Sequence, residues 1–332
     1  MRITQSGTYR TIMNEMDRLT QGLNTLQVQA ATGKKVTTAS DDPTAVQPML
    51  FTRSQMTETD QYISNVTDGL DRMDVMDGYL DTTQNYLTRV KEIGIAGANA
   101  TLNKTDRLSY ADELSQIRGA ITDQLNAQFN GRHLFSGYKE GTAPVGTTEG
   151  ASVDSPNGTA VAGMTTYAVS GEISQDEIKL QTGPGQTIQV NLNVEELIKT
   201  QVPVRDADGT IQTDADGDPI MEEVNLLDTL ASMEAALRAN EPQGVSAMLD
   251  DLEVGAEQVR LKRSSMGNSA NRLETALNSL EQSKLDLKET LSGYEDADLV
   301  ETLAKMTQQE SALQAALTVT GRVSKLSILD YI

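Results

Sequence analysis

Two adjacent carboxylates, Asp41 and Asp42, stand in the stretch TASDDPTAV at residues 38–46. Paired acids can serve acid–base catalysis or bind a metal, but they can also begin a helix. Pro43 follows directly, and proline is favoured at the first helical position because its missing N–H would be unsatisfied there anyway. Aspartate is a preferred N-cap, and its charge suits the positive end of the helix dipole. The motif therefore predicts a helix start rather than a catalytic dyad.

His133 is the single histidine of the chain. A Ser–His pair or a multi-histidine metal site would have to be built around this one residue, so we expect it to be a polar residue packed at a domain junction. Cysteine is absent, which excludes disulfides and thiolate ligands. The phosphate-binding patterns GxGxxG and GxxxxGK[ST] are also absent. We expect no enzyme activity, no cofactor and no metal.

Two Asp-x-Asp-Gly tetrads, at residues 206–209 and 214–217, could suggest calcium. A calcium loop of the EF-hand type places its glycine at position 6, after acids at positions 1, 3 and 5. Here Gly209 and Gly217 come too early. Because Asp and Gly are also the residues of tight turns, the tetrads favour turns of a β meander. A cation site there is the alternative left open.

The charge balance limits the partners. The chain of 332 residues has 48 acids and 27 bases, a formal net charge of −21. A surface this negative repels phosphate backbones and anionic lipids, which argues against nucleic acid and membrane partners. The stretch MRITQSGTYRTIMNEM has no apolar core of a secretory signal peptide, and no apolar run approaches 18 residues.

Heptad rows dominate both ends of the chain. The first row has steps of 4 and 3 residues and is followed by Gly33 at the position of a C-terminal cap. The last row has the same steps, and Asp298 and Glu301 are spaced as a capping box before it. We predict that these two rows are assembly surfaces. Their members are Ile12, Met16, Leu19, Leu23 and Leu26 at one end, and Ala312, Ala316, Val319, Val323 and Leu326 at the other.

Longer helices are predicted between these ends. One begins near Pro43, and a further helix is expected over residues 106–130, with Thr105 as N-cap and Gly131 as stop. The strongest row places eight apolar residues seven apart, which predicts one helix of about 75 Å that Gly293 interrupts. The row consists of Val245, Leu252, Val259, Met266, Leu273, Leu280, Leu287 and Tyr294.

The middle of the chain has a different pattern. Residues 187–194, TIQVNLNV, alternate apolar and polar side chains, which predicts a strand. The fold class expected is mainly α with a β-rich insert: an elongated long-helix bundle or coiled coil, with the chain ends together and the β domain at the far end. The predicted segments are 1–38 and 296–332 as terminal coiled-coil helices, 39–139 and 223–295 as a helical rod, and 140–222 as the β-rich domain.

Three stretches resemble the flagellin family, most closely its hook-associated junction members. TGKKVTTASDDPTAV follows the first terminal helix, NGRHLFSGYK enters the β domain, and LSILDYI ends the chain. Filament flagellins usually lack a proline after the acid pair and end differently. The resemblance covers both helical thirds, whereas the β insert carries no motif that matches.

The resemblance implies a structural role at the junction between hook and filament. It implies export through the flagellar type III apparatus to the extracellular flagellum, without a signal peptide. The implied partners are flagellin on the distal side, another hook-associated junction protein on the hook side, further copies of this chain in a ring, and an export chaperone on the C-terminal helix. The terminal helices would form coiled coils in the tube wall.

Three other interpretations are open. A filament flagellin is the alternative within the family, although Pro43 and the ending LDYI argue against it. A cytoplasmic coiled-coil signalling protein of chemoreceptor type would lack a β insert and would carry paired methylatable Glu and Gln sites, which this sequence does not offer. An enzyme in the β domain is the weakest option, given one histidine and no nucleophile motif.

Overall fold

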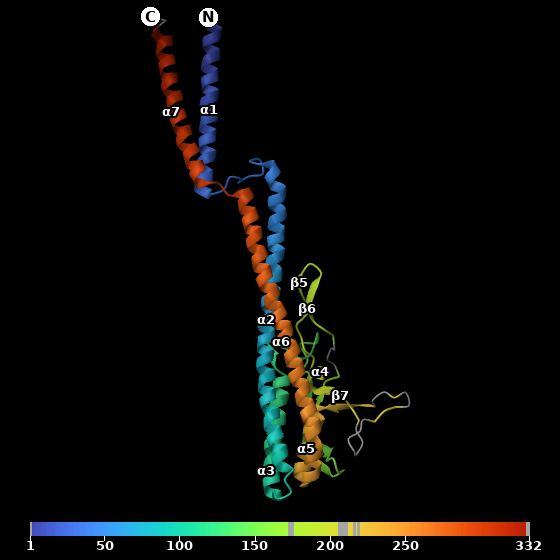
Figure 1. The fold of residues 1–332 in the computed structure, drawn as a ribbon. Coiled ribbons are helices and arrows are strands. Elements are labelled where there is room, and N and C mark those ends of the chain that lie inside the picture. Colours follow the sequence, from blue (N-terminus) through green and yellow to red (C-terminus); the bar gives the residue numbers. More distant parts are fainter. Residues whose placement is uncertain (1, 172–175, 205–211, 215–216, 218–219, 330–332) are drawn as a thin grey trace. The chain divides into compact units, whose positions relative to one another are not determined.

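The computed structural model describes residues 2–171, 176–204, 212–214, 217 and 220–329. Seven helices and eight strands are assigned in this part of the chain, in the order α1, α2, α3, β1 to β6, α4, β7, β8, α5, α6 and α7 (Figure 1). The chain divides into two compact units. The terminal unit consists of Met1–Gln61 and Glu281–Ile332, and the central unit consists of Tyr62–Leu280. The long helices α2 and α6 contribute to both units.

The terminal unit is helical. It consists of α1 (Arg2–Thr32), the first part of α2 (Pro43–Gly97), the last part of α6 (Pro242–Glu295) and α7 (Leu299–Leu329). Helices α1 and α7 contact each other and run in opposite directions, so the two chain ends come to the same end of the unit (Figure 1). The predicted proximity of the chain ends is confirmed.

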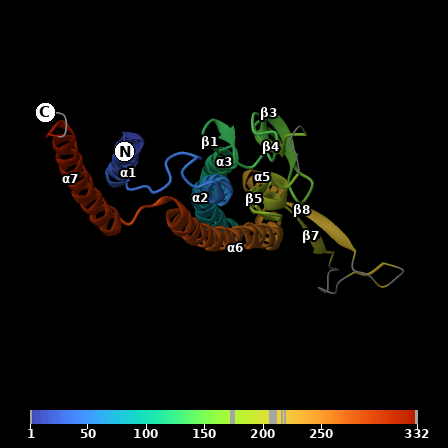
Figure 2. The ribbon, with the colours of Figure 1, turned by 90° about the horizontal axis from the view of Figure 1, so that it is seen from above.

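The central unit adds shorter elements to α2 and α6. Helix α3 (Lys104–Leu125) lies beside α2 (Figure 2) and contacts α5 (Leu226–Ala239). Its apolar core includes rows from α2 and α6 that are almost fully buried. These rows are Val66, Met73, Leu80 and Leu87 from α2, and Val245, Leu252, Val259, Met266 and Leu273 from α6.

The strands form four separate two-stranded antiparallel hairpins within the described residues. They are β1 (Gln128–Phe129) with β2 (Arg132–His133), β3 (Val145–Asp154) with β4 (Ala160–Val169), β5 (Lys179–Gly183) with β6 (Gln186–Gln189), and β7 (Lys199–Pro203) with β8 (Met221–Asn225). The mainly α fold with a β-rich insert is confirmed, but the insert consists of separate hairpins rather than a meander.

The strand predicted over residues 187–194 is only partly correct, because β6 ends at Gln189. The Asn191 side chain accepts from the Ile178 backbone N–H (2.7 Å) and donates to the Asp176 carbonyl (3.1 Å). Such side-chain bonds compete with a strand ladder. Val194 then begins the short helix α4 (Val194–Ile198). The apolar side chains of the segment are nevertheless buried, as the alternation predicts.

The helix predicted over residues 106–130 is shorter than expected. It begins at Lys104, and its N-cap is Asn103, whose side chain accepts from the Asp106 N–H, rather than Thr105. It ends at Leu125, and Asn130 and Gly131 form the turn of the β1–β2 hairpin, with φ of 51° and 77°. Positive φ at both central residues defines a type I′ turn, for which Asn-Gly is the preferred pair.

The C-terminal third contains one helix more than the sequence predicts. Helix α5 is separated from α6 by Asn240, which adopts the left-handed conformation (φ 61°) as the C-cap. Asparagine tolerates this conformation better than most residues, and Pro242 then begins α6. The long helix itself is confirmed, although it continues through Gly293 to Glu295 instead of ending at the glycine.

Candidate assembly surface

The antiparallel pair α1 and α7 is the candidate functional surface, because it is thinly packed. The predicted row on α1, from Ile12 to Leu26, lies on the side that faces α7, and every member is half-buried rather than buried. A heptad row that closes on one partner helix buries its residues more fully. Part of this apolar row is therefore still accessible in the single chain.

The protected face of α7 differs from the row that the sequence predicts. Ala312 and Ala316 are half-buried, but Val319 is 51% exposed. Val323 and Leu326 lie where the structure does not describe side-chain burial. The more protected row has steps of 4 and 3 residues and includes polar side chains. Its members are Thr302, Met306, Gln309, Leu313, Ala316 and Thr320.

Polar contacts hold this pair at two levels. Gln309 donates from Nε2 to the Leu19 carbonyl (3.3 Å), and the Thr320 hydroxyl lies 3.6 Å from the Met16 sulfur. A Cβ at Gly22 would come within 2.1 Å of Gln309 Nε2, so a larger residue there would displace the end of the Gln309 side chain. Sequence analysis missed Gly22, Gln309 and Thr320, because a search for apolar spacing passes over polar and very small residues.

The pair leaves apolar surface uncovered. A groove of about 650 Å³ runs between the helices and is lined by Leu19, Leu26, Ala312 and others. Val300 is 80% exposed, and several further apolar side chains on both helices are about half exposed. These are Tyr9, Met13 and Val28 on α1, and Leu299, Leu303, Leu317 and Val319 on α7. Exposed apolar surface of this kind marks interaction sites.

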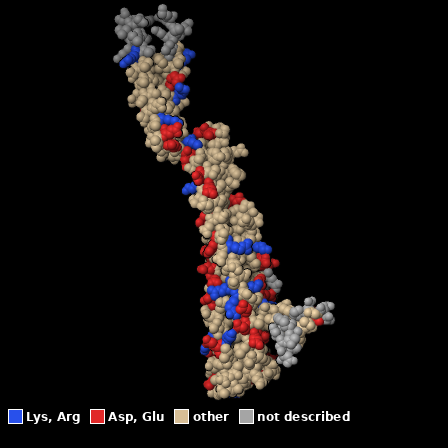
Figure 3. Space-filling view, in the orientation of Figure 1, with Lys and Arg blue, Asp and Glu red and all other residues tan. Residues whose placement is uncertain are grey.

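Charge is distributed unevenly along the terminal unit and the long helices. Residues 19–33 of the chain carry no charged side chain, and neither do residues 311–321. Figure 3 shows Asp, Glu, Lys and Arg concentrated along the long helices, where ion pairs such as Arg263 with Asp77 (2.7 Å) join α6 to α2. The buried centre of a protein interface is depleted of charge. The uncharged stretches of α1 and α7 fit that composition.

The acid pair before α2 has two different structural roles. The Asp42 Oδ1 atom accepts from the backbone N–H groups of Thr44 (3.0 Å) and Ala45 (3.2 Å), at the N-terminus of a helix that begins at Pro43. The Asp41 Oδ2 atom instead accepts from the N–H groups of Thr38 (2.7 Å) and Thr37 (2.9 Å), which closes a turn in the preceding linker.

Hydrogen bonds to the charged form lower the pKa of both carboxyls. The backbone N–H of Thr38, followed by that of Thr37, lowers the pKa of Asp41 to about 2. The Thr44 hydroxyl, followed by the Thr44 backbone, lowers the pKa of Asp42. Both groups therefore stay ionised near neutral pH as acceptors, which does not suit a shared catalytic proton.

His133 has the hydrogen bonds of a packed structural residue. It is buried in β2, with Nδ1 2.8 Å from the Asn126 carbonyl and Nε2 3.0 Å from Gln128 Nε2. Both ring nitrogens are thus engaged locally. Within the described part of the chain, no three His, Cys, Asp or Glu side chains are grouped to hold a metal.

The Asp-x-Asp-Gly tetrads lie largely outside the described residues. Of the second tetrad, Asp214 and Gly217 are described, and the Gly217 N–H donates to the Asp214 carbonyl (3.2 Å) with φ of 89° at the glycine. That bond is the one expected of a tight turn.

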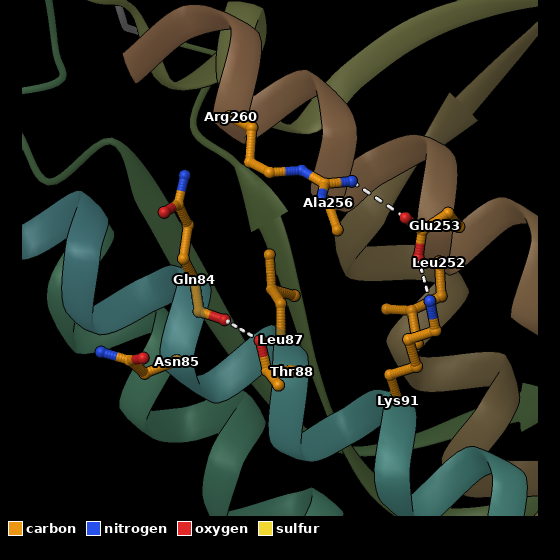
Figure 4. Close-up of a pocket in the computed structure, with 9 residues that line it drawn as sticks. All are labelled: Gln84, Asn85, Leu87, Thr88, Lys91, Leu252, Glu253, Ala256 and Arg260. Carbon is orange, nitrogen blue, oxygen red and sulfur yellow. Dashed lines mark hydrogen bonds and ion pairs between the residues drawn. The ribbon is translucent and has the colours of Figure 1, made fainter. Parts of the chain in front are cut away.

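A groove of about 330 Å³ lies between α2 and α6 in the central unit (Figure 4). Its charged side chains are all paired, because Glu253 accepts from Lys91 (2.6 Å) and from Arg260 (2.9 Å), and Arg260 also pairs with Glu257 (2.6 Å). The other lining side chains, such as Gln84 and Thr88, come from the polar face of α2. The groove presents no unpaired group for chemistry. No helix in the described ranges is long and apolar enough to cross a membrane.

Comparison with known proteins identifies the family. Residues 3–140 match the family model of the bacterial flagellin N-terminal helical region, and residues 249–332 match that of the bacterial flagellin C-terminal helical region. A flagellin of Bacillus subtilis is 24% identical over 324 residues, 94% of each chain. Flagellar hook-associated protein 3 of Escherichia coli is 24% identical over 316 residues, which cover 91% of this chain and 90% of the relative.

A solved structure supports the fold. A flagellar hook-associated protein of Vibrio parahaemolyticus superposes with a TM-score of 0.60 at 22% identity, and the match covers 77% of this chain and all of that one. The two family models together span both helical ends and leave the hairpin-rich middle unmatched, where the sequence resemblance also stops. The chain belongs to the bacterial flagellin family.

Proposed function

We propose that this chain is a structural subunit of the bacterial flagellum that joins the hook to the flagellin filament and assembles through α1 and α7. The observation that carries the proposal is the incompletely buried interface between α1 and α7, called the α1–α7 seam below. Its apolar rows are half-buried, apolar side chains beside them are exposed, and long stretches of both helices are uncharged. A subunit whose function is packing needs such surface for its neighbours.

The partners of this proposal follow from the place of a junction subunit. Flagellin lies on the distal side, a hook-associated junction protein lies on the hook side, and copies of the chain form a ring. The α7 helix is apolar enough to need cover before assembly, which an export chaperone provides. The site of action is the extracellular flagellum. The likeness to hook-associated protein 3 and the Pro43 motif support the junction role.

A deletion strain tests the role directly. Cells without this chain are expected to carry hooks without filaments and to release flagellin into the medium, and the intact gene should restore filaments. A variant that lacks residues 2–32 should be secreted without restoring them. Normal swimming of the deletion strain contradicts the proposal.

A filament flagellin is the second candidate, because the Bacillus subtilis flagellin matches along 94% of both chains. Self-assembly of the purified protein separates the two candidates. A junction subunit is expected to stop at short rings or to require its neighbours. Long filaments formed by this chain alone would favour the flagellin.

A further inference from the structure

One face of the α2–α6 pair in the central unit carries two grooves of about 330 Å³ each. The first is the groove of Figure 4, called the paired groove below. The second, called the acidic groove, is lined by α2 between Leu70 and Asp77 and by α6 between Met266 and Glu274. On both helices, every position that lines one groove lies two heptads from a position that lines the other. Because positions seven residues apart share one face of paired helices, the two grooves are equivalent sites.

The floor of the acidic groove is apolar. Met73 and Met266, which line it, are only 3% and 5% exposed, and Ala270 of the same lining is half-buried. Gly267 also lines the groove, and no atom lies within 4 Å of the place where its Cβ would be. The groove is therefore open at this point, whereas the equivalent position of the paired groove holds the larger side chain of Glu253.

The two grooves differ in charge. In the paired groove, the cations Lys91 and Arg260 both pair with Glu253. The equivalent positions of the acidic groove hold Asp77 and Glu274. Each cation of the first groove thus has a carboxylate in its place in the second.

Two further carboxylates, Asp71 and Asp74, line the acidic groove at positions that are uncharged in the paired groove. Asp77 pairs with Arg263 (2.7 Å). The side chains of Asp71, Asp74 and Glu274 have no hydrogen bond or ion pair with another described residue, and no described lysine or arginine lines this groove. Carboxylates that share a groove repel one another, and the repulsion is relieved when a cation enters.

An apolar floor beneath unpaired carboxylates has the composition of a docking groove. Protein interfaces combine an apolar, buried centre with a polar rim, and charge complementarity across the rim selects the partner. The segment that fits the acidic groove therefore has an apolar side chain for the floor at Met73 and Met266, and lysine or arginine side chains for the carboxylates.

A second copy of this chain has few free cations for this role. Within the described part of the central unit, the Lys and Arg side chains are hydrogen-bonded or ion-paired inside the chain, with three exceptions: Lys104, Lys139 and Arg272. The chain also has a formal net charge of −21, so charge opposes a contact between two central units. The charge balance favours a partner of another kind, whose cations are free.

We propose that the acidic groove docks a segment of a different flagellar protein, in which lysine or arginine side chains flank an apolar one. The cations of that segment take the place that Lys91 and Arg260 have in the paired groove. This docking rests on the proposed function, because it requires a neighbour of another kind beside this chain in the flagellum. It adds a contact of the central unit to the assembly surface of α1 and α7.

Photo-cross-linking in intact flagella tests the groove. A photoreactive phenylalanine analogue is placed at Asn271, an exposed residue one turn from Gly267 on α6, so that the groove itself stays unfilled. The full chain with this probe is produced in the deletion strain, and its flagella are irradiated and isolated. We expect a cross-link to a different flagellar protein, and mass spectrometry should place it within a few residues of a lysine or arginine.

The charge of the groove is tested by neutralising its three unpaired carboxylates together, with Asp71→Asn, Asp74→Asn and Glu274→Gln. Loss of three exposed ion pairs should lower the yield of the cross-link by about tenfold. The control removes the same charge from exposed carboxylates outside both grooves and should leave the yield unchanged: Asp123→Asn, Glu149→Gln and Asp154→Asn. Melting curves of the purified chains show that each variant is folded.

Three results would overturn the docking. They are a cross-link to a second copy alone, equal yields in the two triple variants, and no cross-link from a chain that is present in the isolated flagella. If the chain is absent from flagella, the proposed function fails, and the partner named here falls with it.

Discussion

The seam between α2 and α6 in the central unit and the seam between α1 and α7 are built on the same heptad spacing. They bury their residues to different degrees. In the first, Met73, Leu80 and Leu273 are at most 3% exposed, whereas in the second the members from Ile12 to Leu26 are all half-buried. The heptad spacing of apolar residues therefore determines that two helices pair. The elements packed around the pair determine whether its apolar residues become fully buried.

The row along α6 shows the same contrast within one helix. Its members up to Leu273 are buried, Leu280 and Leu287 are half-buried, and Tyr294 is 38% exposed. Burial falls near Leu280, where the central unit ends; Leu273, the last buried member, still lies with Leu180 and Val190 around Gly69. Regions with few buried apolar contacts open more readily, so we expect the terminal helices to be the least protected helices of the free subunit.

The largest expected effect comes from removing one side of the open seam. Deletion of residues 2–32 should abolish assembly, because α7 loses its partner and the joint surface disappears. The melting temperature of the central unit should hardly change, because its core is built from other residues. Calorimetry of the truncated chain, alongside complementation of the deletion strain, measures both. Filament growth with the truncated chain would contradict the role of the seam.

A large effect on stability is expected at the buried ion pair of the central unit. Arg118 on α3 and Glu234 on α5 pair with only 2% of either side chain exposed, and Arg118 also donates to the Thr165 carbonyl (2.8 Å). Glu234→Ala leaves a buried, unpaired cation, which costs about 3–5 kcal/mol of unfolding free energy. Urea unfolding followed by circular dichroism measures the loss.

The control for that variant is Glu113→Ala. Glu113 pairs with Arg89 (2.7 Å), but the pair is solvent-exposed, so its loss should cost under about 1 kcal/mol. Equal losses of unfolding free energy in the two variants would show that the Arg118–Glu234 pair is not buried as the structure indicates.

A Leu→Ala substitution in each of the two seams is expected to have an intermediate effect on stability, and the two costs should differ. Leu80→Ala removes a side chain that is 1% exposed and should cost about 3 kcal/mol, as core leucines do. Leu19→Ala removes a half-buried side chain and should cost the free subunit less than half as much. Chemical unfolding gives the first value, and hydrogen exchange in α1 gives the second. If Leu19→Ala were the costlier change in the free subunit, the seam between α1 and α7 would already be closed.

The predictions from sequence succeeded where apolar residues of similar size repeat. The rows on α2 and α6 predicted two long helices, and the Asp42–Pro43 pair predicted the residue at which α2 begins. Gly131 was misread, because a glycine after a helical pattern can end a helix or form a turn, and only the chain direction after it distinguishes them. The five segment boundaries and the assembly role of the terminal rows stay predictions.

Two features of the terminal unit could not be predicted from local pattern. The protected row on α7 contains Gln309 and Thr320, which a search for apolar spacing discards. An ion pair joins Lys34 of the α1–α2 linker to Glu295 of α6, and the sequence around either residue does not name the other as its partner. Contacts between residues so far apart in sequence depend on the tertiary fold, and a single sequence contains no signal for them.

The smallest expected effect concerns pH and the linker turn. The Thr38 and Thr37 amides lower the pKa of Asp41 to about 2, so the folded carboxyl is ionised down to lower pH than the unfolded one. A depressed folded pKa contributes stability that is fully present above the unfolded value of 3.8 and is lost as the pH falls through about 2. An NMR titration should therefore show the Thr37 and Thr38 amide shifts constant between pH 7 and pH 4. Asp41→Asn should change these shifts at every pH. A titration midpoint near pH 4 in the unaltered chain would contradict the prediction, because it would mean that the Asp41 carboxylate does not accept from the Thr37 and Thr38 amides in solution.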